Sequence, residues 1–457
     1  MKQADVVVLG GSAAGVTAAV TARRHYPDKS ILIIRREAKA IIPCGIPYIF
    51  GTIKDPEEDL LPDSILEKNN IEILISQATG IDRVGKIVHT KDGDVRYDRL
   101  VLAIGSSPII PRIKGAELDG TFAVYKDIEY LRRMQNRLQQ ANDIVIIGGG
   151  FIGIELGDEI NKMGNKNVTI VEIMPHCLNA AYDEEFCVEM EEHLISRGLN
   201  IRTSTRVEEI RGNEHVESVL LSDGTELKAD VVVFAIGAVS NVDIARSAGL
   251  RVGQKGSIYV DRTMMTSDPN IFACGDCAEK FSFFGWRASA LKLASIATLE
   301  GRICGANLFG ITRENPGTVG VWATAVGELA LGTAGLTETM ANNQGYQTIC
   351  GVVEGPNRHP AGMPGASKMK VKLVFEKNSE VLLGGQVRGD NTAAEMINAI
   401  SALVQRRLTA EDIAVFQMGT HPALTTSPVA YPLVNAAEIA ISKKRSSLNW
   451  PRFKNKE

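Results

Sequence analysis

The chain has 457 residues, which is long enough for about three domains. Of these residues 44% are hydrophobic and 23% are charged, a composition typical of globular proteins. The formal net charge of −4 does not indicate a basic surface that would bind nucleic acid. The sequence contains no run of about 20 apolar residues, the length needed to span a membrane. We therefore expect a cytoplasmic protein without nucleic-acid or membrane partners, and the 43 glycines with only 5% aromatic residues favour a nucleotide-binding α/β fold.

The seven cysteines are scattered and odd in number, which argues against the disulfide framework of a secreted protein. Cys274 and Cys277 form a C-x-x-C pair, but the sequence holds no second pair that would complete a zinc site. We therefore expect no metal.

A dinucleotide-binding unit is predicted at the start of the chain. Residues 5–9 read as a buried parallel strand, followed by the glycine turn 10–15 and by a helix of small residues that ends at about Arg24. Such a turn brings backbone amides and a helix N-terminus to a pyrophosphate, although Ser12 stands in place of the second glycine of the motif.

The second strand of this unit, residues 31–34, leads into Arg35 rather than into the acid that usually binds a ribose. Glu37 is the candidate for that role two residues later. The alternative is that the ribose is held by another group.

The same pattern returns in complete form in the middle of the chain. A strand at 143–147 precedes the G-x-G-x-x-G of residues 148–153, and a second strand at 168–171 ends in Glu172. A carboxylate at this position binds a ribose 2′-hydroxyl and repels a 2′-phosphate, so we expect NADH rather than NADPH.

Two further strands that run into glycine turns, at 97–106 and 229–237, occupy equivalent places in the two units and support an internal duplication. A third, at 271–276, ends in Asp276, which could bind a polyol or could be a turn residue.

The C-terminal part has a different pattern, from about residue 315. Alternating stretches, among them 370–375 and 381–387, predict an antiparallel sheet, with helices at 392–404 and 409–415. The basic residues from 443 onward predict a solvated, partly disordered tail, with contact to an anionic substrate as the alternative.

A single cysteine, Cys44, lies in a segment with restricted backbone geometry. Pro43 and Pro47 each fix φ, and Gly45 permits the close approach of a flat ligand. A short helix predicted at 47–50 would place the thiol just before a helix N-terminus, which favours thiolate. The alternative is an inert cysteine.

Together these motifs resemble one family, the pyridine nucleotide-disulfide oxidoreductases, over nearly the whole chain. The motifs, in chain order, are Gly10-x-Ser12-x-x-Gly15, Cys44-Gly45-Ile46-Pro47-Tyr48, Ala103-Ile104-Gly105-Ser106, the second glycine motif with Glu155 and Glu172, and Cys274-Gly275-Asp276. In particular the chain looks like the single-cysteine branch, which contains coenzyme A disulfide reductase, NADH oxidase, NADH peroxidase and persulfide or polysulfide reductases.

The resemblance implies two Rossmann-like dinucleotide-binding domains, for FAD and NAD, and a C-terminal α+β dimerisation domain in a homodimer. The implied boundaries are residues 1–115 and 243–320 for the FAD domain, 116–242 for the NAD domain, 321–445 for the dimerisation domain and 446–457 for a basic tail.

The resemblance also implies which residues bind the cofactors. Those of the FAD site are Gly10, Ser12, Ala13, Ala14, Gly15, Glu37, Ala103, Gly105, Ser106, Gly275 and Asp276. Those of the NADH site are Gly148, Gly150, Phe151, Ile152, Gly153, Glu155, Glu172 and Gly237.

The chemistry at Cys44 follows from what surrounds it in the sequence. Positions 45–49 contain no second cysteine, so a lone thiolate must be resolved by an external thiol, sulfane sulfur or peroxide. Ala13 stands where the peroxidase and oxidase relatives carry a histidine, which favours reduction of a small disulfide, persulfide or polysulfide, with coenzyme A among the candidate thiols. The alternatives are an NADH oxidase that reduces oxygen at the flavin, a reductase of a small electron-transfer protein, and a redox sensor.

Four more residues are implicated by the resemblance. His421, followed by Pro422, resembles a histidine that two-cysteine relatives donate across the dimer as acid and base, although the acid that orients it is replaced by Thr426. Tyr431 resembles a tyrosine that coenzyme A disulfide reductases supply from the partner subunit. Arg23 and Arg24 are candidates for the phosphates of coenzyme A, or else they interact with the C-terminus of their own helix.

Overall fold

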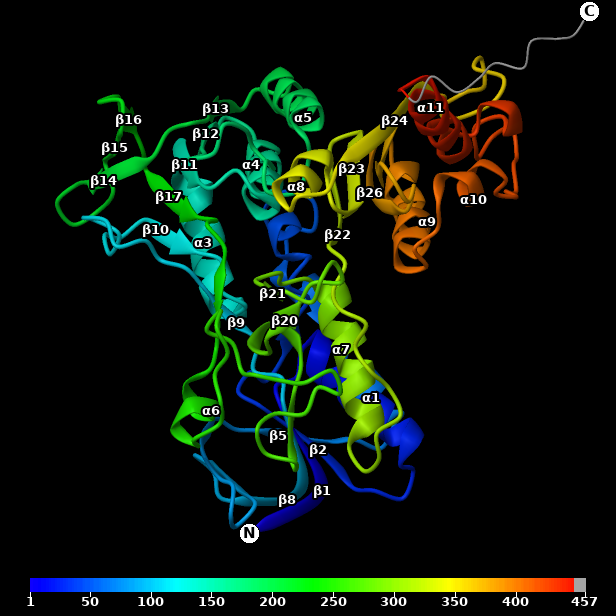
Figure 1. Ribbon diagram of the computed structural model, residues 1–457. Coiled ribbons are helices and arrows are strands. Elements are labelled where there is room, and N and C mark those ends of the chain that lie inside the picture. Colours follow the sequence, from blue (N-terminus) through cyan, green and yellow to red (C-terminus); the bar gives the residue numbers. More distant parts are fainter. Residues whose placement is uncertain (448–457) are drawn as a thin grey trace, which may run out of the picture. The chain divides into compact units, whose positions relative to one another are not determined.

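A computed structural model describes residues 1–447, which form two compact units (Figure 1). The first unit contains Met1–Gly148, Glu159–Thr169 and Val207–Thr318. The second contains Gly149–Asp158, Ile170–Arg206 and the chain from Val319 onward. No helix within residues 1–447 is long and apolar enough to cross a membrane.

The first unit is built on a seven-stranded sheet in the order β5-β2-β1-β8-β7-β6, with β19 beside β8. Strands β1, β2, β5, β8 and β19 are parallel, whereas β6 and β7 pair antiparallel. The strands are β1 (Lys2–Leu9), β2 (Ile31–Arg35), β5 (Glu72–Ile75), β6 (Ala78–Asp82), β7 (Ile87–Thr90), β8 (Val95–Leu102) and β19 (Ile271–Ala273). The apolar run of β1 is buried on both faces, as expected of a parallel sheet, and the strands predicted from the first unit of the sequence are confirmed.

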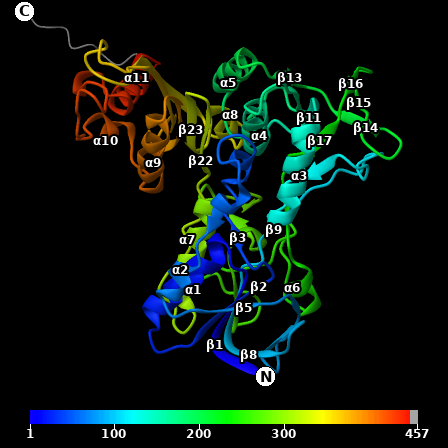
Figure 2. The ribbon, with the colours of Figure 1, turned by 180° about the vertical axis from the view of Figure 1, so that it is seen from behind.

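Helices α1 (Ala13–His25) and α7 (Ala294–Asn307) lie side by side in both ribbon views (Figures 1 and 2). Glycine permits this approach: a Cβ at Gly301 would lie 2.7 Å from Ala14 O, and one at Gly305 would overlap Ala18 O. The pair therefore presents the N-terminus of α1 in a fixed place at the carboxyl end of β1.

The first unit also contains the parallel strands β10 (Thr121–Ala123), β17 (Val231–Phe234) and β11 (Asp143–Ile147), with helix α3 (Ile128–Gln140) between β10 and β11 in the chain. The two glycine turns predicted to be equivalent are neighbours, because β9 (Ser106–Pro108) pairs antiparallel with β18 (Ala238–Ser240).

The second unit contains a five-stranded antiparallel sheet in the order β22-β23-β26-β25-β24, which confirms the antiparallel prediction. Helices α9 and α11 pack on the face that contains Gly332 and Gly351. On the opposite face, Lys372 and Gln386 contact Asp183 at the start of α5. The bounds are β22 (Val321–Val326), β23 (Leu329–Gly335), β24 (Thr348–Pro356), β25 (Lys368–Glu376), β26 (Leu382–Gly389), α5 (Glu184–Ser196), α9 (Thr392–Gln405), α10 (Ala410–Ala414) and α11 (Pro432–Ser447).

The first residues of the predicted solvated tail are exposed but helical, because α11 continues to Ser447. Its apolar side chains recur at helical spacing and are buried, at Leu433, Ala436, Ala437, Ala440 and Ile441. The basic residues lie on the exposed side of this helix, where Lys444 pairs with Glu380 (2.8 Å) and Arg445 with Glu411 (3.1 Å). The rest of the expected tail, residues 448–457, lies outside the described residues.

Candidate active site

The first glycine turn has the geometry of a pyrophosphate-binding loop. Gly10 has φ +113°, and a Cβ there would overlap Ala103 O, while a Cβ at Gly15 would overlap Gly10 O. Only glycine fits these positions, and the turn leads directly into α1, whose N-cap Ser12 uses its side chain to cap none of the helix amides. The amides at the start of α1 and the Ser12 hydroxyl thus fit the phosphates of FAD.

The structure brings two of the predicted cofactor motifs together at the carboxyl ends of β8 and β19. Ser106 Oγ donates a hydrogen bond to Asp276 Oδ2 (2.8 Å), and Lys126 Nζ lies 3.6 Å from the same oxygen. Gly105 and Gly275 both have positive φ (+68° and +76°), so each turn depends on glycine. Ligands of parallel α/β sheets bind at this edge.

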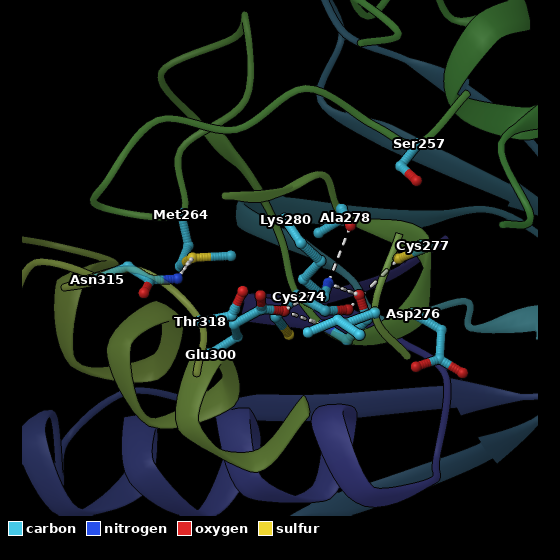
Figure 3. Close-up of polar contacts among 12 residues, drawn as sticks. Ser257, Met264, Cys274, Asp276, Cys277, Ala278, Lys280, Glu300, Asn315 and Thr318 are labelled. Carbon is cyan, nitrogen blue, oxygen red and sulfur yellow. Dashed lines mark hydrogen bonds and ion pairs between the residues drawn. The ribbon is translucent and has the colours of Figure 1, made fainter. Parts of the chain in front are cut away.

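A buried ion pair between Lys280 and Glu300, which the sequence did not reveal, binds the backbone of the turn that carries Asp276. Lys280 Nζ lies 2.9 Å from Glu300 Oε2 and also donates to the carbonyls of Gly275 (2.5 Å) and Ala278 (2.9 Å). Gly275 N donates to the same Glu300 oxygen (2.9 Å). Figure 3 shows Lys280 directed towards Glu300 and the turn, with the Asp276 carboxylate pointing away from them. Burial raises the pKa of Glu300 to about 6.

The C-x-x-C pair lies in the same region but has no metal-binding geometry. Cys274 and Cys277 are fully buried, and Cys277 Sγ contacts the carbonyls of Leu102 and Cys274. Within residues 1–447 no group of three or more His, Cys, Asp or Glu side chains could hold a metal ion.

Arg35 stands where an acid was expected, and its side chain forms an ion pair with Asp63. Its guanidinium makes two hydrogen bonds of 2.6 Å to the oxygens of Asp63, and its stem packs on Gly11 of the glycine turn. Glu37, the predicted ribose ligand, accepts hydrogen bonds from Arg36 (2.9 and 2.6 Å). Sequence reasoning missed Asp63 because it lies 28 residues from Arg35.

The second glycine motif is divided between the two units, and its residues in each unit have the geometry expected of a dinucleotide-binding loop. In the first unit, Gly148 has φ +109° and a Cβ there would lie 2.6 Å from Ala235 O. In the second unit, the Glu172 carboxylate accepts hydrogen bonds from the amides of Gly149 (2.6 Å) and Met174 (2.7 Å). A Cβ at Gly150 would meet no atom within 4 Å, so the loop leaves room for a pyrophosphate.

Helix α4 (Phe151–Asn161) continues this motif, with Ile152 and Gly153 in its first turn. The Phe151 ring stacks on Trp322 (centroids 6.2 Å apart, interplanar angle 8°), and Glu155 accepts a hydrogen bond from Thr324 Oγ1 (2.7 Å). Gly237, with φ +99°, accepts a hydrogen bond from Ile109 N (3.0 Å).

Cys44 is the one cysteine of the chain with an exposed side chain. Its turn is closed by a hydrogen bond from Gly45 N to Ile42 O (2.9 Å), and the predicted short helix follows as a 3-10 helix, η1 (Ile46–Phe50). The other six cysteines are buried, and burial raises the pKa of Cys187, Cys277 and Cys350 to about 12, which keeps them as thiols.

The second unit holds His421 and Tyr431. The His421 side chain is exposed, and its Nδ1 accepts a hydrogen bond from Ala423 N (3.2 Å), which places the proton of the neutral ring on Nε2. Thr426 is buried. Tyr431 is half-buried, and burial raises the pKa of its hydroxyl.

The two arginines at the end of α1 differ in their surroundings. The Arg23 guanidinium donates to four backbone carbonyls, those of Pro27, Lys29, Asn69 and Asn70. Arg24 is exposed. Arg23 thus holds the loops after α1 and α2 (Ser64–Glu67), whereas Arg24 faces solvent.

Comparison with known proteins gives consistent matches over the chain. Residues 4–301 match the family model of pyridine nucleotide-disulphide oxidoreductases, and residues 321–430 match the dimerisation domain of the same family. An NADH oxidase from Methanocaldococcus jannaschii is 32% identical over 96% of this chain and 98% of its own length. An NAD(P)H coenzyme A polysulfide/persulfide reductase from Pyrococcus horikoshii is 31% identical over 95% and 98%.

Among solved structures, an NAD-dependent persulfide reductase from A. fulgidus is similar with a TM-score of 0.90 and 31% identity, over 96% of this chain and 84% of that one. The family uses FAD and NADH, which agrees with the two glycine loops, and its dimerisation domain indicates a homodimer. The fold and the expected cofactors are therefore confirmed, and the chain belongs to the pyridine nucleotide-disulphide oxidoreductases.

Proposed function

We propose that this oxidoreductase reduces a low-molecular-weight disulfide, persulfide or polysulfide with NADH, through FAD and the single redox cysteine Cys44. The observation that carries the proposal is that one thiol of seven is exposed, on a turn ahead of η1, while burial keeps the others out of thiol exchange. The names of the relatives from P. horikoshii and A. fulgidus agree with such a substrate.

The reaction at Cys44 has two halves. The Cys44 thiolate attacks one sulfur of the substrate, so that a bond from Cys44 to that sulfur forms, the original S–S bond breaks and one thiolate leaves with the electron pair. Bound FAD supplies the electron pair, taken from NADH, that cleaves the mixed disulfide and restores the Cys44 thiolate. Each leaving thiolate takes up one proton.

The residues proposed to hold FAD are those of the first glycine loop together with Ser106 and Asp276, and Glu37 for the ribose. Glu172, fixed by two backbone amides, is proposed to bind the ribose of NADH and to exclude the 2′-phosphate of NADPH.

We propose His421 and Tyr431 as the groups that protonate the leaving thiolate, supplied by the partner subunit of the homodimer. His421 suits this role because its neutral ring carries the proton on the nitrogen that is not bonded to Ala423. For a coenzyme A substrate, Arg24 is the better candidate of the two arginines to meet phosphates, since it is exposed and Arg23 already donates to four carbonyls.

The proposal is tested with Cys44→Ser. We expect the variant to keep flavin reduction by NADH and to lose reduction of coenzyme A disulfide, coenzyme A persulfide and polysulfide by at least a hundredfold. Cys187→Ala, which removes a buried thiol of α5, is the control and should retain turnover. Full turnover by Cys44→Ser would remove the cysteine from the mechanism.

The second candidate function is an NADH oxidase that reduces oxygen at the flavin, which the name of the M. jannaschii relative favours. Ala13 offers no acid or base in the first glycine loop, which weighs against peroxide chemistry. Stoichiometric formation of peroxide or water from NADH and air, independent of Cys44, would support the oxidase.

A further inference from the structure

A buried carboxyl group, that of Asp59, lies directly against the turn that carries Cys44. Asp59 ends the 3-10 helix η2 (Pro56–Asp59) and is only 4% exposed. A Cβ at Gly45 would overlap Asp59 Oδ1 and lie 2.5 Å from Asp59 Cγ. Because a Cα–Cβ bond adds about 1.5 Å, the carboxyl carbon is within about 4 Å of Gly45 Cα, and Gly45 is the next residue after Cys44.

The backbone holds this arrangement in place on both sides. Ile42 N donates a hydrogen bond to Asp59 O (2.9 Å). The adjoining strands β3 (Ala40–Ile41) and β4 (Leu60–Leu61) pair antiparallel, so the residues before the Cys44 turn are bonded to the residues around Asp59. The backbone that carries Asp59 is therefore fixed against the turn.

The charged groups on the elements packed against η2 do not neutralise Asp59. Lys39, before β3, and Arg132, on α3, both bind Glu57 (2.5 and 2.9 Å), and Glu58 is exposed. Within residues 1–447, Asp59 Oδ2 is buried and has no hydrogen-bond partner, and burial raises the pKa of Asp59 to about 6. A carboxyl in this state is costly to ionise, and more costly still beside a second negative charge.

We propose that Asp59 is a positioning residue that holds a proton for Cys44: the carboxyl is protonated while Cys44 is a thiolate and ionised while its sulfur is in a mixed disulfide. This inference rests on the proposed function. In the first half-reaction Asp59 releases its proton as the negative charge of Cys44 is consumed, and the leaving thiolate takes up one proton through the groups proposed above. When the electron pair from NADH restores the Cys44 thiolate, Asp59 takes up a proton and the second thiol leaves with another, so one NADH and one solvent proton balance the two thiols.

The test measures ionisation of Cys44, not turnover, so it can fail independently of the proposed function. Alkylation of Cys44 by iodoacetamide is followed by mass spectrometry from pH 5 to 9 in the FAD-loaded enzyme without NADH. Because Asp59 is protonated while Cys44 is a thiolate, the neutral Asp59→Asn should reproduce the wild-type alkylation profile, whereas a profile about one pH unit lower would show that Asp59 is ionised before Cys44 and would overturn the inference. Glu58→Gln, which removes an exposed charge from the same helix, should leave the profile unchanged.

A measurement on the wild-type enzyme covers the case in which Asp59→Asn does not fold. Infrared difference spectra are recorded at about pH 6.5 before and after Cys44 is blocked with methyl methanethiosulfonate. We expect the signal of one protonated carboxyl group to disappear on blocking, because the thiolate that kept Asp59 protonated is gone. A spectrum without this loss would show that Asp59 and Cys44 do not share a proton.

Discussion

Replacing Lys280 by Met tests whether the buried ion pair supports the Asp276 turn. Lys280 and Glu300 side chains are 3% and 0% exposed, and Met fills nearly the same volume without a charge. The change removes three hydrogen bonds of Lys280 Nζ and leaves Glu300 buried without a cation. Breaking a buried pair in this way costs about 3–5 kcal/mol of the free energy of unfolding.

The pH dependence of that cost follows from Glu300. Its pKa in the folded protein is already about 6, above the ordinary value of 4.5, so its contribution to stability is full below 4.5 and is lost as the pH rises through 6. This corresponds to about 2 kcal/mol in the wild-type protein. Without Lys280 the pKa of Glu300 rises further, and stability then continues to fall above pH 6 by up to about 1.4 kcal/mol per pH unit.

Urea unfolding of the FAD-loaded enzyme, followed by circular dichroism and by release of FAD, measures the effect. We expect the difference in the free energy of unfolding between Lys280→Met and the wild-type protein to increase from pH 6 to pH 8. The matched control is Lys280→Met combined with Glu300→Gln, which has no buried charge and should recover part of the loss and show no such widening. A loss below about 1 kcal/mol at pH 8, or one that does not change with pH, would refute this account of the pair.

Two further changes test the proposed cofactor and proton roles. Glu172→Ala removes the carboxylate that is expected to repel the 2′-phosphate of NADPH. The ratio of kcat/KM for NADPH to kcat/KM for NADH should therefore rise by about tenfold or more. An unchanged ratio would show that Glu172 does not determine which cofactor is used. His421→Ala should lower disulfide reduction by about a hundredfold while flavin reduction by NADH is retained; unaltered disulfide reduction would assign His421 to packing.

The parts of the fold that the sequence predicted correctly are those in which local sterics leave little choice. Gly10 and Gly148 have positive φ and approach a carbonyl that a side chain would strike, so a strand, a glycine turn and a helix follow from the local residues. Helix α11 was missed because the basic residues around Lys444 are conspicuous, whereas the buried alanine-rich face of the helix is a weak apolar signal. The partner of Arg35 was out of reach because the pairing with Asp63 is set by tertiary structure.

The two buried acids of this molecule show why site chemistry is harder to predict than the fold. Asp59 belongs to the run Asp55-Pro-Glu-Glu-Asp59, which has the composition of a solvated surface, and Glu300 lies in a helix of small residues with little periodicity. Nothing local distinguishes them from their exposed neighbours. Only the fold shows that one carboxyl faces Gly45 and the other faces Lys280. Each is held beside a turn that carries a proposed functional residue, and burial there raises the pKa of the carboxyl group to about 6.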